Sequence, residues 1–129
     1  MSDKPISQRL SLKPGCRFLV INPPDGYRSL MGVLPAGVEL LAETSQPVEA
    51  IQVFVANRGE LEAQLPRLKL LLTRNGMMWV TYHKGTSKVK TDINRDTIVA
   101  YAQTLGLQGV AMISIDQDWA ALRLKFLQT

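Results

Sequence analysis

Short apolar runs alternate along this chain with stretches in which apolar residues recur every three or four positions. A run of four to eight apolar residues between turn residues is typical of a buried strand, whereas the wider spacing is typical of a helix that buries one face. The runs predict strands at residues 16–21, 38–42, 50–56, 77–82, 110–115 and 120–127. The run 50–56 is almost continuously apolar, as expected of a strand covered on both faces.

Helical spacing is clearest between the third and fourth of these strands. Leucines recur there at intervals of three and four, at Leu61, Leu65, Leu68 and Leu72. Asn57 is placed to cap the start of this helix, and Asn75-Gly76 supplies a left-handed stop. Because proline cannot donate a backbone hydrogen bond, Pro66 predicts either a kink or a new helix that begins there.

Two further helices are expected. Residues 27–34 follow the loop 22–26, whose two prolines exclude regular structure, and predict a short helix. A longer helix is expected over 93–105, capped by Thr91 or Asp92 and ended by Gly106. Residues 1–11 are polar and aperiodic, and we interpret them as a loosely attached arm that precedes a single domain over 12–129.

This order of elements predicts an α/β three-layer sandwich. Strands that alternate with helices favour right-handed crossovers and a mostly parallel, Rossmann-like sheet. The three residues 116–118 are a short enough joint for the last two strands to form a C-terminal antiparallel hairpin. An unprotected edge on this hairpin would allow a symmetric dimer, although Arg123 and Lys125 alternate along its last strand and disfavour edge pairing. The oligomeric state is therefore left open.

Composition narrows the class of protein. The chain has 129 residues, of which 46% are hydrophobic and 20% charged, the balance of one soluble globular domain. It has no apolar run of membrane-spanning length, and its first residues lack a secretory pattern, so we expect a cytoplasmic protein without a membrane partner. One cysteine and one histidine provide neither an internal disulfide nor a structural zinc site, and no metal is expected.

Positive charge is concentrated in the middle of the chain. The net charge is +4, and the stretch 63–91 has no acidic residue but six basic ones, Arg67, Lys69, Arg74, Lys84, Lys88 and Lys90. These residues either form a solvated surface or attract an anionic small molecule or an acidic protein partner. Nucleic acid is a less suitable partner, because few aromatic residues interleave with the basic ones and no nucleic-acid-binding motif is present.

The best candidate site is the strand, loop and helix start over residues 77–96. Cationic and hydroxyl side chains lie there between the carboxyl end of a strand and the amino end of a helix, where backbone N–H groups favour an anion. The candidate ligand-binding residues are Lys84, Gly85, Thr86, Ser87, Asp92, Asn94 and Arg95. Three residues in this segment also have a structural interpretation. Asp92 would be a helix cap, Arg95 would hold Asp92 or the closing hairpin, and His83 would be an ordinary loop residue instead of a general acid or base.

Several strings give the chain a resemblance to a known family. They are L-K-P-G-C-R-F-L-V-I-N-P-P-D-G-Y at 12–27, W-V-T-Y-H-K-G-T-S at 79–87, T-D-I-N-R-D at 91–96 and D-W-A-A-L-R at 118–123. Over residues 12–126 the chain resembles an uncharacterised bacterial family of small domains related to the class I methyltransferase fold. The resemblance implies a Rossmann-like fold, with the closing hairpin equivalent to the sixth and seventh strands of methyltransferases, and does not imply an activity.

The cofactor chemistry of that fold is incomplete in this sequence. Binding of S-adenosylmethionine needs a glycine-rich turn after the first strand and an acidic residue after the second. Glu43 lies 21 residues beyond Asn22 and could supply the acid, but Pro23 and Pro24 stand where flexible glycines would be needed. We therefore expect no cofactor.

Two functional hypotheses remain. The first is a non-catalytic binding or regulatory module that holds an anionic ligand at residues 77–96. The alternative is a divergent enzyme that transfers a methyl group from S-adenosylmethionine, or another group. Its crevice would be formed by the loops after the first and fourth strands. The candidate residues are Asp25, Tyr27, Glu43 and His83, with Asn22 as a further candidate in the first loop.

Overall fold

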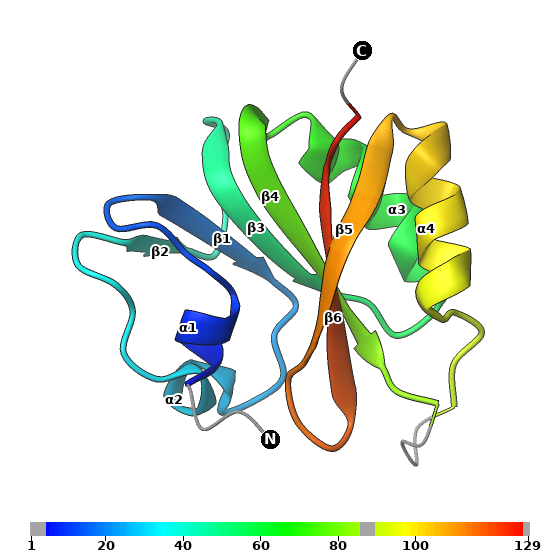
Figure 1. Ribbon diagram of the computed structural model, residues 1–129, viewed down its shortest axis with the longest axis horizontal. Coiled ribbons are helices and arrows are strands. Elements are labelled where there is room, and N and C mark those ends of the chain that lie inside the picture. The colour runs from blue at the N-terminus through cyan, green and yellow to red at the C-terminus, as the bar shows by residue number, and fades with distance from the viewer. Residues whose placement is uncertain (1–4, 86–89, 128–129) are drawn as a thin grey trace.

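The strands of this protein form one mixed sheet. The computed structural model describes residues 5–85 and 90–127, so that Thr86 and Ser87 of the predicted site lie outside the described residues. Within this part of the chain the strands are β1 (Arg17–Ile21), β2 (Glu39–Leu41), β3 (Val48–Phe54), β4 (Leu72–His83), β5 (Leu107–Ser114) and β6 (Trp119–Phe126). Their order across the sheet is β2-β1-β3-β4-β6-β5 (Figure 1). The pairs among β1 to β4 are parallel, and β6 is antiparallel to both β4 and β5, which confirms the predicted C-terminal hairpin.

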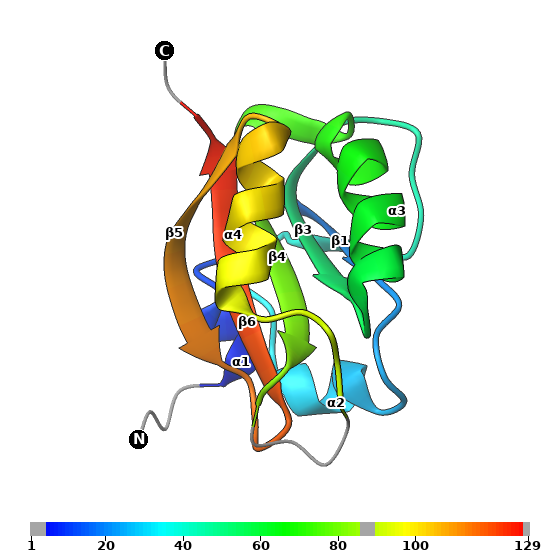
Figure 2. The same cartoon turned by 90° about the vertical axis from the view of Figure 1, so that its right-hand side faces the viewer.

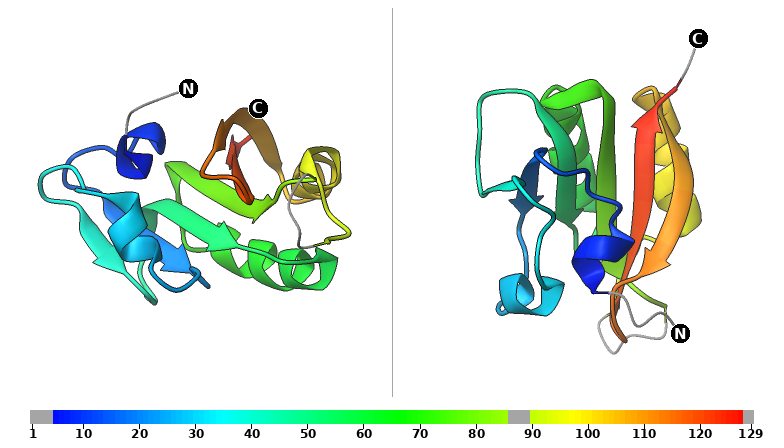
Figure 3. Two further views of the ribbon diagram at one scale, coloured as in Figure 1. Left: turned by 90° about the horizontal axis from the view of Figure 1, so that it is seen from below. Right: turned by 60° about the vertical axis from the view of Figure 1, so that its left-hand side comes forward.

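Helices cover both faces of the sheet. On one face lie the short helices α1 (Ile6–Arg9) and α2 (Tyr27–Met31), and on the other lie α3 (Arg58–Lys69) and α4 (Arg95–Thr104) (Figures 2 and 3). The three predicted layers are therefore present. Among the described residues no helix has both the length and the apolar character needed to cross a bilayer.

Each face of the sheet has its own core. Leu61, Leu65 and Leu68 of α3 pack with Ile98 of α4 against the apolar residues of β3 and β4. On the opposite face the buried core residues include Ile6, Leu10, Phe18, Tyr27, Met31, Phe54 and Trp79. The alternation of side chains along a strand sends successive residues of β3 and β4 into these two cores, as the apolar run predicted.

The amino-terminal segment differs from the loosely attached arm that we predicted. Residues 6–9 form α1, and Leu10 is completely buried beneath the sheet. The indole Nε1 of Trp79 donates a hydrogen bond to the Leu10 carbonyl at 3.0 Å, and the Ser7 hydroxyl donates to the Val33 carbonyl at 2.6 Å. Only two apolar side chains are needed to anchor so short a segment, which is too few to produce a recognisable period.

Helix α3 begins where predicted but ends earlier. The Asn57 side chain accepts a hydrogen bond from the Glu60 amide, and Glu60 in turn accepts one from the Ala56 amide, both at 2.9 Å. The first bond is an N-cap, and the second ties the Glu60 side chain to the residue before the cap. The helix continues through Pro66 and ends at Lys69. The carbonyl of Glu62, which would otherwise bond to the missing proline N–H, accepts a hydrogen bond from the Tyr101 hydroxyl at 3.4 Å.

The expected stop at Asn75-Gly76 was wrong, because both residues lie inside β4. The pairing of β4 with β3 shifts its register between Val48 and Ala50, beside this position. A side chain at Gly76 would place its Cβ only 2.9 Å from the Glu49 carbonyl oxygen. The glycine therefore permits a close approach of two backbones at an irregularity in the sheet.

Helix α4 is capped by a different residue from the two that we predicted. Asn94 accepts the hydrogen bond from the Thr97 amide at 2.9 Å. Thr91 instead donates to the Ala56 carbonyl at 2.7 Å, and Asp92 accepts from the Arg58 amide at 2.8 Å. Asp92 thus satisfies an N–H group in the first turn of α3, a partner that neighbouring sequence positions could not suggest.

The edge of the sheet also differs from the expectation. Strand β6 lies between β4 and β5, so Arg123 and Lys125 are on an inner strand and β5 forms the edge. The side chains of these two cations therefore project from one face of the sheet, on an inner strand, and do not protect the sheet edge.

Candidate functional site

The candidate site lies at the carboxyl ends of the parallel strands. The connection after β1 runs through α2 to β2 on one side, whereas the connection after β3 runs through α3 to β4 on the other. Such a reversal opens a crevice at the ends of the strands, which is the usual ligand position in open α/β sheets. Figure 2 shows α2 and the connection from β4 to α4 at this same end of the molecule.

The loop after β1 is anchored by Tyr27. This side chain is buried, and its hydroxyl donates a 2.6 Å hydrogen bond to Oε1 of Gln52 in β3. Gln52 Nε2 donates in turn to the Thr81 hydroxyl of β4 at 3.0 Å, so three buried polar groups form a satisfied chain across the sheet. Burial also raises the pKa of Tyr27 well above its usual range, which keeps the phenol protonated as the donor.

Aromatic rings extend from Tyr27 along the same end of the sheet. The ring of Tyr27 meets Phe54 edge to face at a centroid distance of 4.8 Å, and Phe54 meets Trp119 in the same way at 5.1 Å. His83 stacks on Trp119 at 3.9 Å. Its Nδ1 is buried and has no hydrogen-bond partner in the described part of the chain. The row fills space at the ends of β1, β3 and β4 with packed side chains.

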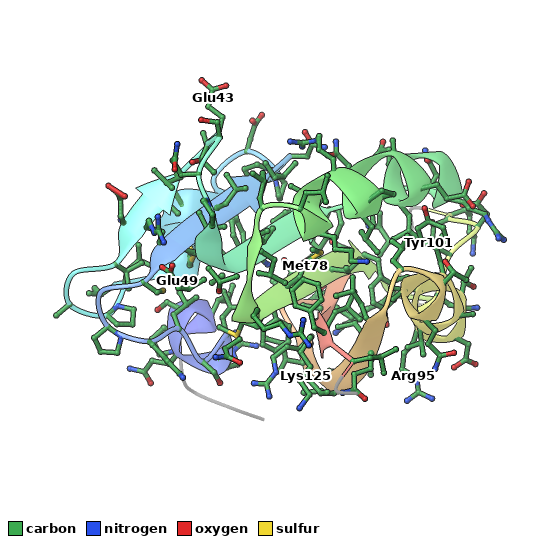
Figure 4. All side chains as sticks on the ribbon, turned by 90° about the horizontal axis from the view of Figure 1, so that it is seen from above. Glu43, Glu49, Met78, Arg95, Tyr101 and Lys125 are labelled. Atoms are coloured by element: carbon green, nitrogen blue, oxygen red, sulfur yellow. The ribbon has the colours of Figure 1, made fainter. Side chains whose placement is uncertain are left out.

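A hollow of about 450 Å³ lies beside this row, between the loop after β1, α2 and the end of β2. Of the four residues predicted in this region, Asp25 and Tyr27 line it. Asn22 is exposed and has a left-handed backbone (φ 57°), which fits the sharp turn before the two prolines. Glu43 is exposed and projects away from the body of the molecule (Figure 4).

Lys84 is held against the closing hairpin. Its ammonium donates to the Ser114 hydroxyl at 2.6 Å, and its amide donates to the Asp118 carbonyl at 2.8 Å. The side chain is half-buried, while the adjacent Gly85 is exposed with open space where a side chain would stand. An ammonium has three donor positions, so the contact with Ser114 leaves two for other acceptors.

The remaining predicted residues have structural partners. The carboxylate of Asp92 caps α3, and the side chain of Asn94 caps α4. Arg95 is exposed, lies 3.5 Å from Asp96, and borders a separate hollow of about 440 Å³ between α4 and β5. The structure therefore places Arg95 beside β5, whereas Lys84 contacts the turn between β5 and β6.

Gln52, Thr81 and Ser114 were not among the predicted site residues. A glutamine inside an otherwise apolar strand was a visible signal, because a buried amide requires hydrogen-bond partners. Nothing in the sequence indicated that Ser114 would meet Lys84, since the two are brought together only by the pairing of β4, β6 and β5.

Comparison with known proteins shows the fold. No family model and no curated protein matches the chain. Solved structures that are similar include a ribosomal protein L11 methylase from Lactobacillus delbrueckii subsp. bulgaricus, with a TM-score of 0.62 and 12% identity, covering 94% of this chain and 74% of that one. An rRNA methylase from Streptococcus thermophilus is similar with a TM-score of 0.60 and 11% identity over 99% of both chains.

A third similar structure is a TehB-like SAM-dependent methyltransferase from Corynebacterium glutamicum, with a TM-score of 0.60 and 12% identity, covering 96% of this chain and 89% of that one. Identities this low establish the fold alone. The Rossmann-like, methyltransferase-like architecture predicted from the sequence is confirmed.

Proposed function

We propose that this chain is a non-catalytic binding module of the methyltransferase fold, which holds an anionic ligand at the carboxyl ends of its strands. The observation that carries the proposal is the anchored loop after β1. Tyr27 is held there by the buried hydrogen bond to Gln52, directly behind Pro23, Pro24 and Asp25. A loop built and fixed in this way does not offer the flexible glycine backbone that a nucleotide cofactor needs for close approach.

Lys84 is the proposed anion-binding group. Its position at the end of β4 is set by two hydrogen bonds, one from the backbone and one from the ammonium. A side chain that is already ordered loses little rotamer entropy when it binds a ligand. Gly85, Thr86 and Ser87 follow it and are proposed to complete the contacts with N–H and hydroxyl donors.

The functions of Asp92 and Asn94 are then supporting ones. Asp92 bonds to the first turn of α3, and Asn94 begins α4. Both residues fix the end of the connection that starts at Lys84. The remaining ligand candidate, Arg95, would contribute a guanidinium from the exposed start of α4.

The test is the change in melting temperature on addition of phosphorylated metabolites, nucleotides and S-adenosyl compounds. A ligand present at 100 times its Kd stabilises the folded state by about 2.7 kcal/mol. For a domain of this size that corresponds to a rise of roughly 10 °C. We expect a rise with phosphate-bearing compounds that is smaller in Lys84→Gln than in the wild type.

The matched control is Lys69→Gln, which removes a lysine from the last turn of α3 at the other end of the sheet. It should retain the full ligand-induced rise. The comparison uses the rise with ligand relative to each variant's own melting temperature, because Lys84→Gln also changes the contact with Ser114. Equal rises in both variants would remove Lys84 from the proposed site.

The second candidate function is group transfer from S-adenosylmethionine. It is favoured by the structural neighbours, one of which is a SAM-dependent methyltransferase, and by the hollow beside Asp25. In the same experiment, a rise with an S-adenosyl compound that is lost in Asp25→Asn would favour this candidate over the binding module.

A further inference from the structure

A third hollow lies at the opposite end of the sheet from the proposed ligand site. It has a volume of about 580 Å³ and is bordered by the loop 11–16, the start of β4 and the carboxyl-terminal half of β6. This is within the 300–1,000 Å³ range of small-molecule sites. Residues 13–15, from the string at 12–27, and Arg123, from the string at 118–123, both line this hollow.

Three cations line this hollow, namely Lys13, Arg123 and Lys125. Arg123 and Lys125 are two positions apart on β6, so their side chains project from the same face of the sheet. Figure 4 shows Lys125 on the side of the sheet where α1 lies. None of their three side chains has a hydrogen-bond or ion-pair partner among residues 5–85 and 90–127.

The one acidic residue in the described lining of this hollow is already paired with a different cation. Glu49 also lines the hollow, but its Oε2 lies 2.5 Å from the Arg17 guanidinium, and its Oε1 accepts from the Arg17 amide at 2.8 Å. The Arg17 bonds lower the pKa of Glu49, which remains ionised and paired. The charge of the three cations is therefore left without an internal counter-charge.

The neutral groups around the hollow are suited to an anion as well. Ser11 and Thr73 contribute hydroxyls, and Asn75 contributes a side-chain amide. Both Arg123 and Lys125 are half-buried, which reduces the screening of their charges by water. The like charges of Arg123 and Lys125 on one strand repel each other, and the attraction of both to a bound anion would offset that repulsion.

We propose that this hollow is a binding site for a small phosphate-bearing polyanion, separate from the Lys84 site. The planar guanidinium of Arg123 matches two oxygens of one phosphate group, while Lys13 and Lys125 act as point charges on the remainder of the ligand. Three cations from two distant parts of the sequence favour a ligand with at least two anionic groups.

The experiment is isothermal titration calorimetry of the full chain with inorganic pyrophosphate. We expect binding that weakens as salt is raised, and a Kd that increases at least tenfold in Arg123→Gln and in Lys125→Gln. Arg123→Lys keeps the charge but loses the planar fork, and its Kd should lie between those of the wild type and Arg123→Gln. Lys69→Gln, at the end of α3 and outside both proposed sites, should leave this binding unchanged.

Folding of the variants is followed by thermal denaturation without ligand. Because each neutralisation relieves repulsion between like charges, neither glutamine variant should melt below the wild type. Absence of pyrophosphate binding, or binding that Arg123→Gln and Lys125→Gln leave intact, overturns the inference. Binding that is weakened only by Lys84→Gln would also overturn the inference, but it would support the proposed function. The two proposals can therefore fail separately.

Discussion

At the scale of single residues, the hydrogen-bonded side chains of Tyr27, Gln52 and Thr81 determine how the loop after β1 is held. Each of the three is buried, and the two hydrogen bonds satisfy the polar groups that face the core on the α1 and α2 side. A buried acceptor that loses its donor is still out of contact with water, so its desolvation penalty is no longer offset by a hydrogen bond. The chain is therefore a strong constraint on the position of α2.

We predict that Tyr27→Phe lowers the free energy of unfolding by about 1–3 kcal/mol, because Gln52 Oε1 loses its donor in a buried position. Urea denaturation followed by circular dichroism measures the change. The matched control is Tyr101→Phe, whose hydroxyl makes an exposed 3.4 Å bond and whose removal should cost less than about 0.5 kcal/mol. Equal losses in the two variants would contradict a special contribution of the buried chain.

The contact between Arg17 and Glu49 predicts a dependence of stability on pH. Hydrogen bonds from Arg17 lower the pKa of Glu49 in the folded state below the ordinary glutamate value. The unfolded state therefore takes up a proton first as pH falls, and the stabilisation is present above the ordinary pKa and lost as pH falls through the folded one. Glu49→Gln should lose less stability than the wild type between pH 7 and pH 3 in urea titrations.

Glu43→Gln is the control for this pH dependence. Glu43 is an exposed carboxylate in the connection after β2. Its replacement should leave the acid branch of the stability curve as it is in the wild type. A curve flattened equally by both replacements would mean that the Arg17 contact is not responsible.

At the scale of helices and strands, the starts of α3 and α4 each have a local cap, and the start of α3 is also held by a side chain from the entry of α4. Asn57 and Asn94 cap their own helices, while Asp92 reaches from the entry of α4 to the first turn of α3. Local caps such as Asn57 can be read from the sequence because the partner is three residues away. The contact between Asp92 and Arg58 spans 34 positions and requires the fold.

We predict that Asp92→Ala lowers the free energy of unfolding by about 1 kcal/mol, the usual cost of a lost helix cap. Thermal and urea denaturation would measure it. Asp92→Asn retains a side-chain oxygen for the Arg58 amide and should keep most of the stability. An equally large loss in Asp92→Asn would indicate that the charge, and not the hydrogen bond, is what matters.

The order and type of the main elements were predictable because burial on both faces leaves continuous apolar runs, as in β3, and burial on one face leaves the helical spacing of Leu61, Leu65 and Leu68. The end of α3 could not be predicted in this way. Asn75-Gly76 has the composition of a helix stop, but the same glycine also suits a close approach between strands. Local composition cannot distinguish these two uses.

At the scale of the whole molecule, the amino-terminal segment completes the core on one face of the sheet. Ile6 and Leu10 are buried together with Phe18 and Trp79 of the sheet. The candidate site also depends on pairing between distant strands. Asp25 and Tyr27 line one hollow, whereas Lys84 contacts Ser114 and Arg95 lines another hollow between α4 and β5. The contact of Lys84 with Ser114 arises from the pairing of β6 with β4 and with β5, which the local sequence does not specify.

We predict that Leu10→Ala lowers the free energy of unfolding by about 2–5 kcal/mol, the cost of emptying a fully buried leucine position. Chemical denaturation measures the loss. Leu70→Ala, at a leucine that is 83% exposed, should change stability by less than about 0.5 kcal/mol. A small effect at Leu10 would show that α1 is an appendage to an independently stable sheet.

The hydrogen bond from the Trp79 indole to the Leu10 carbonyl gives this protein a natural fluorescent reporter. Undocking of α1 would break that bond and admit water to a ring that is otherwise 1% exposed, and the indole emission would move to longer wavelength. With Trp119 replaced by phenylalanine, the attachment of the first turn could be followed in real time, with no added label.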